Sequence, residues 1–357
     1  MPANRFYHTW VDQIRQLCPQ ARNTLVHNFT WLLIGIYLSR TVHLSAVANK
    51  IPGRAKLNST IQRLRRLLQD GSICVRKWYG PIGEVLLKSQ AQHGRIRLIV
   101  DGSKVSFHHR LLMVSVAYRR RAIPIVWTWV HSGRGHSSAV KQLALLGYVY
   151  KLIANRVSVS VVGDCEFGAI AVLCQLDRWS WRYALRQKGD TLIDLTLHNQ
   201  WQRFGDIVRT PGQSVWLGRG FLTREHVYGT HLLAHWQVGE QEPWLLATNL
   251  PSPQEALHTY RQRMWIEEMF GDLKGHGFNL EDSHLDHFLR LSRLTLAVAL
   301  LYVWLVALGS QTIKRGQRSL VDRADRRDFS IFRIGYNMAE RRLTNEQPLT
   351  ISFTLCF

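Results

Sequence analysis

The sequence predicts an α/β protein, in which a mixed β-sheet flanked by helices follows an all-α N-terminal domain and carries a β-rich insertion before its last helix. Three observations predict this class. Residues 95–186 alternate strand-like runs with helix-like stretches, whereas residues 5–90 contain only helix-like stretches. Residues 187–250 contain short stretches of alternating polarity, which are typical of antiparallel strands. At 357 residues, the chain is long enough for two or three domains.

The charge of the chain indicates a polyanionic partner. The formal net charge is +21, and residues 1–90 alone carry 13 basic and 3 acidic side chains. Nucleic acid is favoured over a membrane surface, because 13 Trp and 11 Tyr accompany the charge and can stack on bases. The apolar run at 294–308 is shorter than the roughly 20 residues that span a bilayer, so we expect a buried helix there and no membrane partner.

The cysteines favour a reduced, cytoplasmic location. The five cysteines include no CxxC pair, which argues against a zinc ribbon or a disulfide framework. The first 19 residues show no charged-then-apolar pattern of a secretion signal.

Residues 1–90 are predicted to form a helical DNA-binding domain. Two helix candidates surround a break at 51–53, with Ser45 as the N-cap of the first and Asn58 or Ser59 as the N-cap of the second. A short helix, a turn and an arginine-rich second helix could form a helix-turn-helix reader of DNA. The alternative is a small basic bundle that packs on the rest of the chain. The arginines expected to contact DNA are Arg63, Arg65 and Arg66.

The order of the next elements predicts where two acidic residues meet. The strand-like runs are 95–100, 111–118, 122–130, 156–162 and 181–186. With their helices they give the order β-β-β-α-β-α-β, which is the ribonuclease-H-like arrangement, assigned here to residues 91–186 and 251–310 as a catalytic domain. Asp101 follows the first strand and Asp164 follows the fourth. These two strands are neighbours in that arrangement, so the two aspartates can converge.

The insertion and the tail complete the chain. Residues 187–250 are expected to be mostly β, ending in a strand at 244–249, with Ser252 as the N-cap of the helix that follows. Residues 311–357 form a C-terminal tail that alternates Arg with Asp and is expected to be loosely packed. The tryptophans of the insertion are Trp201, Trp216, Trp236 and Trp244.

The stretch from Tyr260 to Lys274 carries an unusual pattern of charge. Its polar residues of interest, at relative positions 0, 3, 7 and 14, are Tyr260, Arg263, Glu267 and Lys274. At about 100° per residue of an α-helix, these four fall within an arc of roughly 60°. One helical edge would thus hold a carboxylate between two cations, which suits an enzyme that holds a metal ion against a nucleic-acid backbone. Glu268 lies about 100° off this edge, so Glu267 is preferred as the third acid.

Three carboxylates suit phosphodiester chemistry. Cleavage needs an activated nucleophile on one side of phosphorus and a stabilised leaving oxygen on the other, and two divalent ions roughly 3.5–4 Å apart do both. Mg²⁺, for which Mn²⁺ can substitute, prefers oxygen ligands. The predicted catalytic and metal-binding residues are Asp101, Asp164 and Glu267. The residues expected to contact phosphates nearby are Tyr260, Arg263 and Lys274.

Structural roles could also account for these residues. Asp101 could cap the turn at Gly102, and Asp164 could cap a helix. Arg263 and Glu267 could form a surface pair at i,i+4, worth only about 0.2–0.5 kcal/mol. Glu166 and Glu268 are the nearest acids that could be confused with the chosen set.

At these residues the sequence resembles the insertion-sequence-4 family of bacterial DDE transposases. The spacing Tyr, two residues, Arg, three, Glu, six, Lys is that family's signature, and YRQRMWIEEMFGDLKGHGFNLEDSHL is similar to its wider block. LIVDGSK around Asp101 and VVGDCEFG around Asp164 also look like the family's, and the resemblance covers roughly 95–310. Two positions depart from it: Met264 stands where the family often has Trp, and Gly271 where it often has a basic residue.

The resemblance implies a Mg²⁺-dependent DNA transposase of the cut-and-paste type, with a ribonuclease-H-like catalytic domain and a β-rich insertion. Such an enzyme cuts an insertion sequence at its terminal inverted repeats, often through a hairpin on the transposon end, and then joins the 3′-hydroxyl ends to target DNA. It would act on double-stranded DNA in the bacterial cytoplasm, at the nucleoid, as a homodimer in the DNA complex. A Trp of the insertion can hold a flipped base, and Trp236 and Trp244 lie nearest the Glu267 helix in sequence.

Two other functions stay open. One is a nuclease or resolvase on the same fold that never performs strand transfer. The other is a domesticated, non-catalytic DNA-binding protein whose acids are relics.

Overall fold

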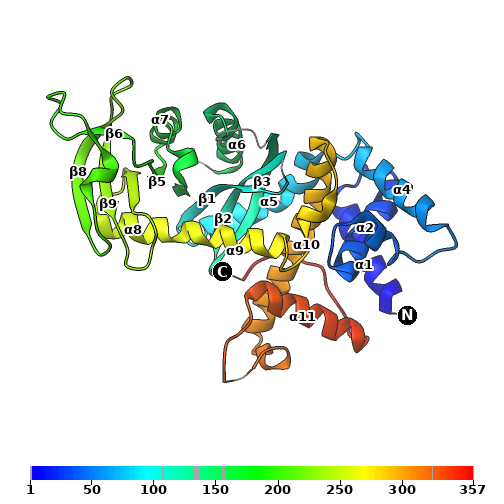
Figure 1. The fold of residues 1–357 in the computed structure, drawn as a ribbon. Helices are drawn as coiled ribbons and strands as arrows, with labels where there is room; N and C mark the ends of the chain where they lie inside the picture. Colours follow the sequence, from blue (N-terminus) through cyan, green and yellow to red (C-terminus); the bar gives the residue numbers. More distant parts are fainter. Residues whose placement is uncertain (1, 107, 132–136, 155–156, 324, 357) are drawn as a thin grey trace.

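The computed structural model describes residues 2–106, 108–131, 137–154, 157–323 and 325–356. Within these ranges the chain forms a mixed sheet of ten strands with helices on both sides (Figure 1). The strand order is β3-β2-β1-β4-β5-β10-β9-β8-β6-β7. The strands are β1 (Arg95–Lys104), β2 (His109–Tyr118), β3 (Arg121–His131), β4 (Ser158–Gly163), β5 (Arg182–Arg186), β6 (Leu192–Asp194), β7 (Gln202–Arg203), β8 (Ser214–Leu222), β9 (Tyr228–His235) and β10 (Trp244–Thr248).

The position of β1 brings the two aspartates side by side. β1 pairs antiparallel with β2 and parallel with β4, with Val100 opposite Gly163. Asp101 and Asp164 are the next residues, so they lie at the same edge of the sheet, and the predicted adjacency of the first and fourth strands is confirmed. One detail of the prediction is wrong. Pairing with β2 keeps β1 extended as far as Lys104, so Asp101 lies within the strand and not after it.

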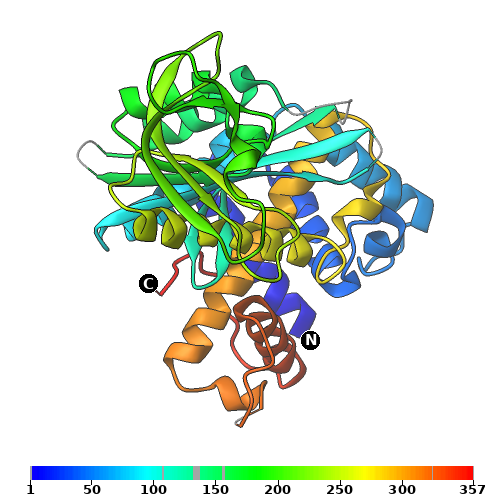
Figure 2. The same cartoon turned by 60° about the vertical axis from the view of Figure 1, so that its left-hand side comes forward.

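Helices cover both faces of this part of the sheet. α6 (Ala139–Leu152) and α7 (Ile170–Arg178) lie on one side, and α8 (Pro253–Tyr260) and α9 (Met264–Leu273) lie on the other (Figures 1 and 2). The sequence of β2 is accordingly apolar along most of its length, since strands buried on both faces lose the alternation of a half-buried strand.

The insertion is rich in β-structure, as predicted, and it extends the same sheet. β10 pairs antiparallel with β5, with Leu246 opposite Arg186, and β9, β8, β6 and β7 follow outward. Two short 3₁₀ turns lie between these strands in the chain. Cys165–Phe167 (η1) follows β4, and Phe204–Ile207 (η2) follows β7. The division of the chain into domains stays a prediction, because these strands and the first five form one continuous sheet.

The N-terminal region is helical within the described residues. Its helices are α1 (Pro2–Leu17), α2 (Asn23–Ser39), α3 (Leu44–Ala48), α4 (Leu57–Gln69) and α5 (Val75–Ala91). The predicted break between α3 and α4 is present, but the predicted N-caps are wrong. His43 and Lys56 precede the two helices, and Ser45 instead hydrogen-bonds the His43 ring at 2.8 Å.

The segment that follows α9 is built on α10 (Phe288–Lys314), which contains the apolar run at 294–308. This helix is long and apolar enough to cross a membrane by length and composition, but 94% of its most apolar window is buried inside the protein. The prediction of a buried helix is therefore confirmed. Two further 3₁₀ turns flank it, Leu280–Ser283 (η4) and Arg318–Leu320 (η5).

The expectation of a loosely packed tail is wrong. α11 (Ile331–Thr344) packs along α10 and beside α1 (Figure 2). The two helices approach closely because Gly309 faces Gly335, and a Cβ on either would meet the backbone of the other helix. Beyond α11, alternate apolar side chains of the last segment are buried, at Leu349, Ile351, Phe353 and Leu355.

Candidate active site

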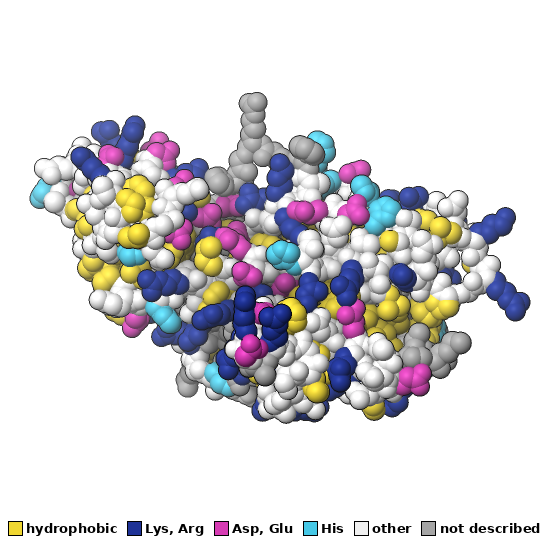
Figure 3. Space-filling view, turned by 60° about the horizontal axis from the view of Figure 1, so that its bottom comes forward, with side chains coloured by type: hydrophobic (Ala, Val, Ile, Leu, Met, Phe, Trp, Pro, Cys, Tyr) yellow, Lys and Arg dark blue, Asp and Glu magenta, His cyan; other side chains and the backbone are white. Residues whose placement is uncertain are grey.

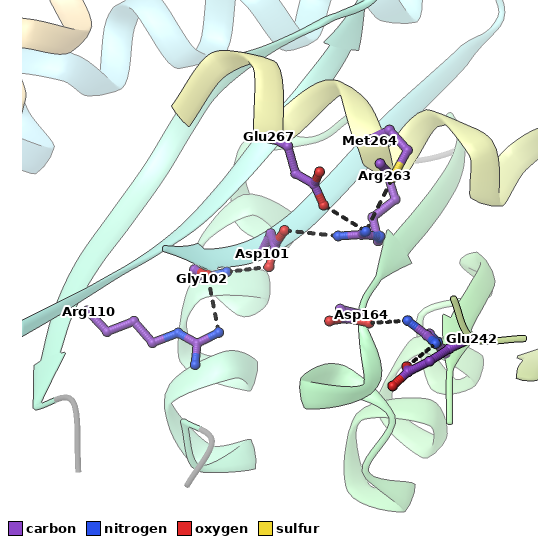
Figure 4. Close-up of polar contacts among 9 residues, drawn as sticks. Asp101, Gly102, Arg110, Asp164, Glu242, Arg263, Met264 and Glu267 are labelled. Atoms are coloured by element: carbon purple, nitrogen blue, oxygen red, sulfur yellow. Dashed lines mark hydrogen bonds and ion pairs between the residues drawn. The ribbon is translucent and has the colours of Figure 1, made fainter. Parts of the chain in front are cut away.

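The structure brings the three predicted acids to one region between β1, β4 and α9. Asp101 comes from β1, Asp164 directly follows β4, and Glu267 lies in the first turn of α9 (Figure 4). Their charges act on one another, since Asp164 and Glu267 both raise the pKa of Asp101. Three acids that are distant in sequence therefore share one electrostatic environment.

Arg263 joins two of these acids. Its Nη1 lies 3.3 Å from Asp101 Oδ2, and its Nη2 lies 2.8 Å from Glu267 Oε1 (Figure 4). The simple i,i+4 pair between Arg263 and Glu267 is thus present, but it is only part of the contact. The Arg263 side chain is only 13% exposed, and its contact with Asp101 joins residues 162 positions apart in sequence. Arg263 therefore does more than form an ion pair on the helix surface.

Asp164 has a different arginine as its neighbour. Arg186, the last residue of β5, places Nη1 3.7 Å from Asp164 Oδ1 and Nη2 2.8 Å from Glu242 Oε2 (Figure 4). Arg186 was not among the site residues predicted from the sequence. The sequence predicted a strand that ends at residue 186, and the structure pairs this strand with β4, so that Arg186 falls at the level of Asp164.

Burial controls the protonation of Asp101. It raises the pKa of this carboxyl to about 7, against the opposing effects of the Arg263 charge and the Gly102 N–H, which donates to Asp101 Oδ1 at 2.7 Å. The pKa of Asp101 therefore lies near neutrality, and above about pH 7 the carboxylate is charged and pairs with Arg263. The Gly102 contact is the one expected of a turn cap, but it occurs within a strand.

Helix capping and the neighbouring glutamates do not explain the three-acid group. Asp164 precedes η1, yet its side chain makes no capping hydrogen bond there. Glu268 points to another face of α9 and pairs with Arg121 at 2.9 Å. Glu166 is buried and pairs with Arg110. Neither of these glutamates belongs to the three-acid group.

The signature residues do not share a single helical edge. Tyr260 ends α8, a 3₁₀ turn of Arg261–Arg263 (η3) follows, and Lys274 comes after the end of α9. The Lys274 backbone, at φ −97° and ψ −132°, has left the helix, so the predicted alignment with Glu267 is wrong. The first helix does begin as predicted, with the Ser252 side chain accepting from the Glu255 N–H.

Tyr260 and Lys274 occupy contrasting positions. The Tyr260 hydroxyl is buried and has no hydrogen-bond partner among the described residues, and burial raises its pKa. Lys274 Nζ instead has two partners, the Lys104 carbonyl oxygen and Glu281 Oε1, each at 2.7 Å. Tyr260 therefore lies close enough to Arg263, Asp164 and Asp101 for their charges to affect its pKa, whereas Lys274 ties the end of α9 to β1.

The tryptophans of the insertion differ in their surroundings. Trp244 is buried against Tyr260, with ring centroids 5.2 Å apart. Trp236 borders a cavity of about 460 Å³ that Arg186 and Gln187 also line. Gln187 is itself buried, and its Nε2 has no partner among the described residues. The other two are partly exposed, Trp216 against His231 and Trp201 bonded to Asn199.

The three predicted arginines of α4 lie far from the acids, at the opposite end of the molecule from β8 (Figure 1). Arg65 and Arg66 are exposed and Arg63 is half-buried. Arg63 and Arg66 line a cavity of about 230 Å³ between α2 and α4, together with Arg22. Lys and Arg side chains also lie next to a group of acidic side chains near the middle of the face drawn in Figure 3.

The acid region suits a hard divalent cation by donor type, but the cation geometry is not formed. Three carboxylates are available, and Asp164 Oδ1 is buried without a hydrogen-bond partner among the described residues. Across those same residues, no group of three His, Cys, Asp or Glu side chains is spaced to hold a metal ion. Arg263 lies between Asp101 and Glu267, and its guanidinium, instead of a metal ion, neutralises the two carboxylates.

A match to a protein-family model identifies the class of protein. Residues 92–304 match the family model described as the transposase DDE domain. The chain belongs to this family, whose members cleave and join DNA and generally use divalent metal ions. No curated protein matches the chain. The chain is similar to a transposase chain in a cryo-EM structure of a piggyBac transposase synaptic complex with hairpin DNA. The alignment covers 98% of this chain and 86% of the piggyBac chain, at 9% sequence identity and a TM-score of 0.43.

Proposed function

We propose that the protein is a cut-and-paste transposase of the insertion-sequence-4 family. It cuts an insertion sequence at its inverted-repeat ends and joins the 3′-hydroxyl ends to target DNA. The observation that carries the proposal is the convergence of Asp101, Asp164 and Glu267 at one edge of a sheet ordered β3-β2-β1-β4-β5. That order is the one expected of a ribonuclease-H-like domain, and the chain belongs to a DDE transposase family.

Asp101, Asp164 and Glu267 would hold Mg²⁺ or Mn²⁺, two ions in the active complex. When bound, the ions supply an activated nucleophile and stabilise the leaving oxygen. Arg263 and Arg186 neutralise the acids in the free protein. A guanidinium released from a carboxylate by a cation can then bind a DNA phosphate, which it grips with two parallel N–H groups.

The hydroxyl of Tyr260 supports a second contact to DNA. It is buried, unpartnered among the described residues, and lies under the influence of Asp101, Asp164 and Arg263. A buried hydroxyl without a partner is costly, and a phosphate oxygen would supply the missing acceptor. Lys274 would act through structure, by fixing the end of α9 against β1.

Trp236 is the better candidate to hold a flipped base. Its cavity of about 460 Å³ has room for a nucleobase and adjoins Asp164 through Arg186. Trp244 is instead committed to the core beside Tyr260. Replacing Trp236 by Ala should reduce cleavage at the transposon end with little loss of stability, while Trp244→Ala should lower stability by about 3–5 kcal/mol. Equal loss of stability in the two variants would contradict this assignment.

The remaining elements fit a protein that works on double-stranded DNA at the nucleoid of a bacterial cell, as a homodimer in the DNA complex. The net charge of +21 and the exposed Arg65 and Arg66 of α4 support backbone contacts. The arginines that line the cavity between α2 and α4 favour phosphate binding over base readout, because α2 occupies one side of them.

The experiment is a joining assay with a pre-cut transposon end, plasmid DNA and Mg²⁺. Joined products are expected with the wild-type chain and none with Asp101→Asn, which should still bind DNA in a salt-sensitive way. Cutting without joining would indicate a nuclease instead. DNA binding with neither reaction, in both chains, would indicate a non-catalytic binder.

A further inference from the structure

Two charged residues next to the acid cluster have no role in the proposed chemistry so far. Arg110, on β2, forms an ion pair with Glu166, in η1. Arg110 is also bonded to the residue after Asp101, and Glu166 stands two positions after Asp164. We propose that this pair, named here the Arg110–Glu166 clasp, sets the separation of Asp101 and Asp164 and thereby the cation affinity of the site. The inference rests on the proposed cation-binding function.

One end of the clasp holds the Asp101 segment. Arg110 Nη2 donates to the Gly102 carbonyl oxygen at 3.1 Å (Figure 4). Gly102 has no side chain, and a Cβ there would lie 2.5 Å from Arg110 Nε. The guanidinium therefore lies directly against the backbone of β1, and only glycine leaves it this space.

The other end holds the segment after Asp164. The Glu166 carboxylate is buried, accepts the Ser137 N–H at 2.7 Å on Oε1, and meets Arg110 with its second oxygen. The Glu166 carbonyl oxygen also accepts from Gln142 Nε2 of α6 at 2.9 Å. With the start of α6 fixing Glu166 and β1 fixing Arg110, the clasp links the two acid-bearing segments.

The position of Arg110 favours a positioning role over a contact to DNA. Its Nε is buried without an acceptor among the described residues, and its Nη2 is engaged by Gly102 and Glu166. The Glu166 side chain is 2% exposed, whereas the Glu267 side chain that pairs with Arg263 is 47% exposed, so the Arg110 pair is far less open to exchange for a phosphate. Residues behind the ligands of a metal commonly change its affinity about 10- to 100-fold when they are replaced.

The chain offers a matched control for the loss of a buried ion pair. Arg318 donates to Asp322 at 2.7 Å, away from the acid cluster, between α10 and α11. The side chains of Arg318 and Asp322 are 23% and 0% exposed, against 25% and 2% for Arg110 and Glu166. Arg110→Gln and Arg318→Gln each leave one buried carboxylate without its arginine, so both disturb folding similarly while only the first touches the acid segments.

The test measures Mn²⁺ binding to the full-length chain by electron paramagnetic resonance, without DNA. Arg110→Gln should weaken Mn²⁺ binding about 10-fold or more, and Arg318→Gln should change it less than about 2-fold. Glu166→Gln, which keeps an acceptor for the Ser137 N–H, provides a second variant if Arg110→Gln does not fold, and it should weaken binding in the same direction. Wild-type Mn²⁺ affinity in a folded Arg110→Gln or Glu166→Gln chain would overturn the clasp and leave the proposed function standing. Mn²⁺ binding that is absent in the wild type, or unchanged in Asp101→Asn, would overturn both.

Discussion

The helix α9 carries acidic residues on two faces, and the arginines that meet them differ. On one face, Arg263 and Arg186 neutralise Asp101, Asp164 and Glu267 through contacts of 2.8–3.7 Å. On the other face, a single residue of β3, Arg121, pairs with both Asp272 and Glu268. Each face involves a carboxyl whose pKa burial raises to about 7: Asp101 of β1, beside the first face, and Asp272 of α9 itself, on the second.

The difference shows how one helix serves both stability and chemistry. Asp272 and Arg121 are 6% and 11% exposed, and their contact joins α9 to β3 within the core. Glu267 is 47% exposed, and Arg263 comes from the turn next to α9, so the pair can separate without moving a strand. On the side of α9 that contacts Arg121, the ion pairs fix the position of the helix. On the side that contacts Arg263, a cation can replace the arginine as the partner of the carboxylates.

The largest expected effect is on DNA cleavage, which should depend on the acids near Arg263 and not on those near Arg121. Asp101→Asn, Asp164→Asn and Glu267→Gln should each reduce DNA cleavage to background, because each removes a negative oxygen donor from the proposed cation site. Asp272→Asn should retain cleavage in the fraction of chains that fold. A gel-based cleavage assay on a transposon-end duplex measures this, and residual cleavage near wild type in any of the three variants would break the distinction.

The second-largest expected effect is a loss of stability when the contact between Arg121 and Asp272 is removed. Arg121→Met should lower the free energy of unfolding by about 1–3 kcal/mol, since it leaves the buried Asp272 carboxyl, whose pKa burial already raises to about 7, without its partner. Denaturant unfolding followed by circular dichroism measures the change. Arg263→Met is the matched variant; it should lower stability less, because it reduces charge in a region where Glu267 is half-exposed. A larger loss in Arg263→Met would reverse the roles assigned to the two faces.

The third effect concerns pH. Asp101 and Asp272 keep their protons to about pH 7 in the folded chain but lose them near 3.8 when unfolded. The folded state therefore binds more protons between these values, so its stability falls as the pH rises from about 4 to 7, by at most about 1.4 kcal/mol per pH unit for each group. Asp272→Asn should flatten this slope in urea titrations across the window. An unchanged slope would contradict the assigned protonation.

The smallest effect compares neighbouring glutamates. Glu268→Gln should change stability by less than about 1 kcal/mol and leave cleavage intact, because Glu268 is 58% exposed and Arg121 keeps its contact with Asp272. The same assays as for Glu267→Gln apply. Loss of cleavage in Glu268→Gln would show that the third acid was assigned to the wrong residue.

The sequence predicted those features that depend on local pattern and strand order. β-branched runs located β1 to β5, and the arrangement of β1 beside β4 followed from element order, so Asp101 and Asp164 could be placed together. The Ser252 cap of α8 was also predictable from its local sequence. Glu267 was chosen by its helical spacing from Arg263 and Lys274, although Lys274 is outside the regular helix.

Long-range packing set the features that the sequence did not predict. Lys274 leaves the α9 helix and contacts the Lys104 carbonyl oxygen of β1, 170 residues away in sequence, as well as Glu281. α11 has a polar composition, yet Gly335 lets it approach α10 closely enough to bury Phe332 and Tyr336. The roles of Arg110 and Arg121 likewise depend on partners more than 50 residues away.

The most direct test of the proposed cation site is an anomalous-scattering map of crystals soaked in Mn²⁺. We expect Mn²⁺ among Asp101, Asp164 and Glu267, with the Arg263 guanidinium displaced, and none beside Asp272 and Glu268. Mn²⁺ bound at other sites only, with Arg263 still joining Asp101 to Glu267, would contradict it.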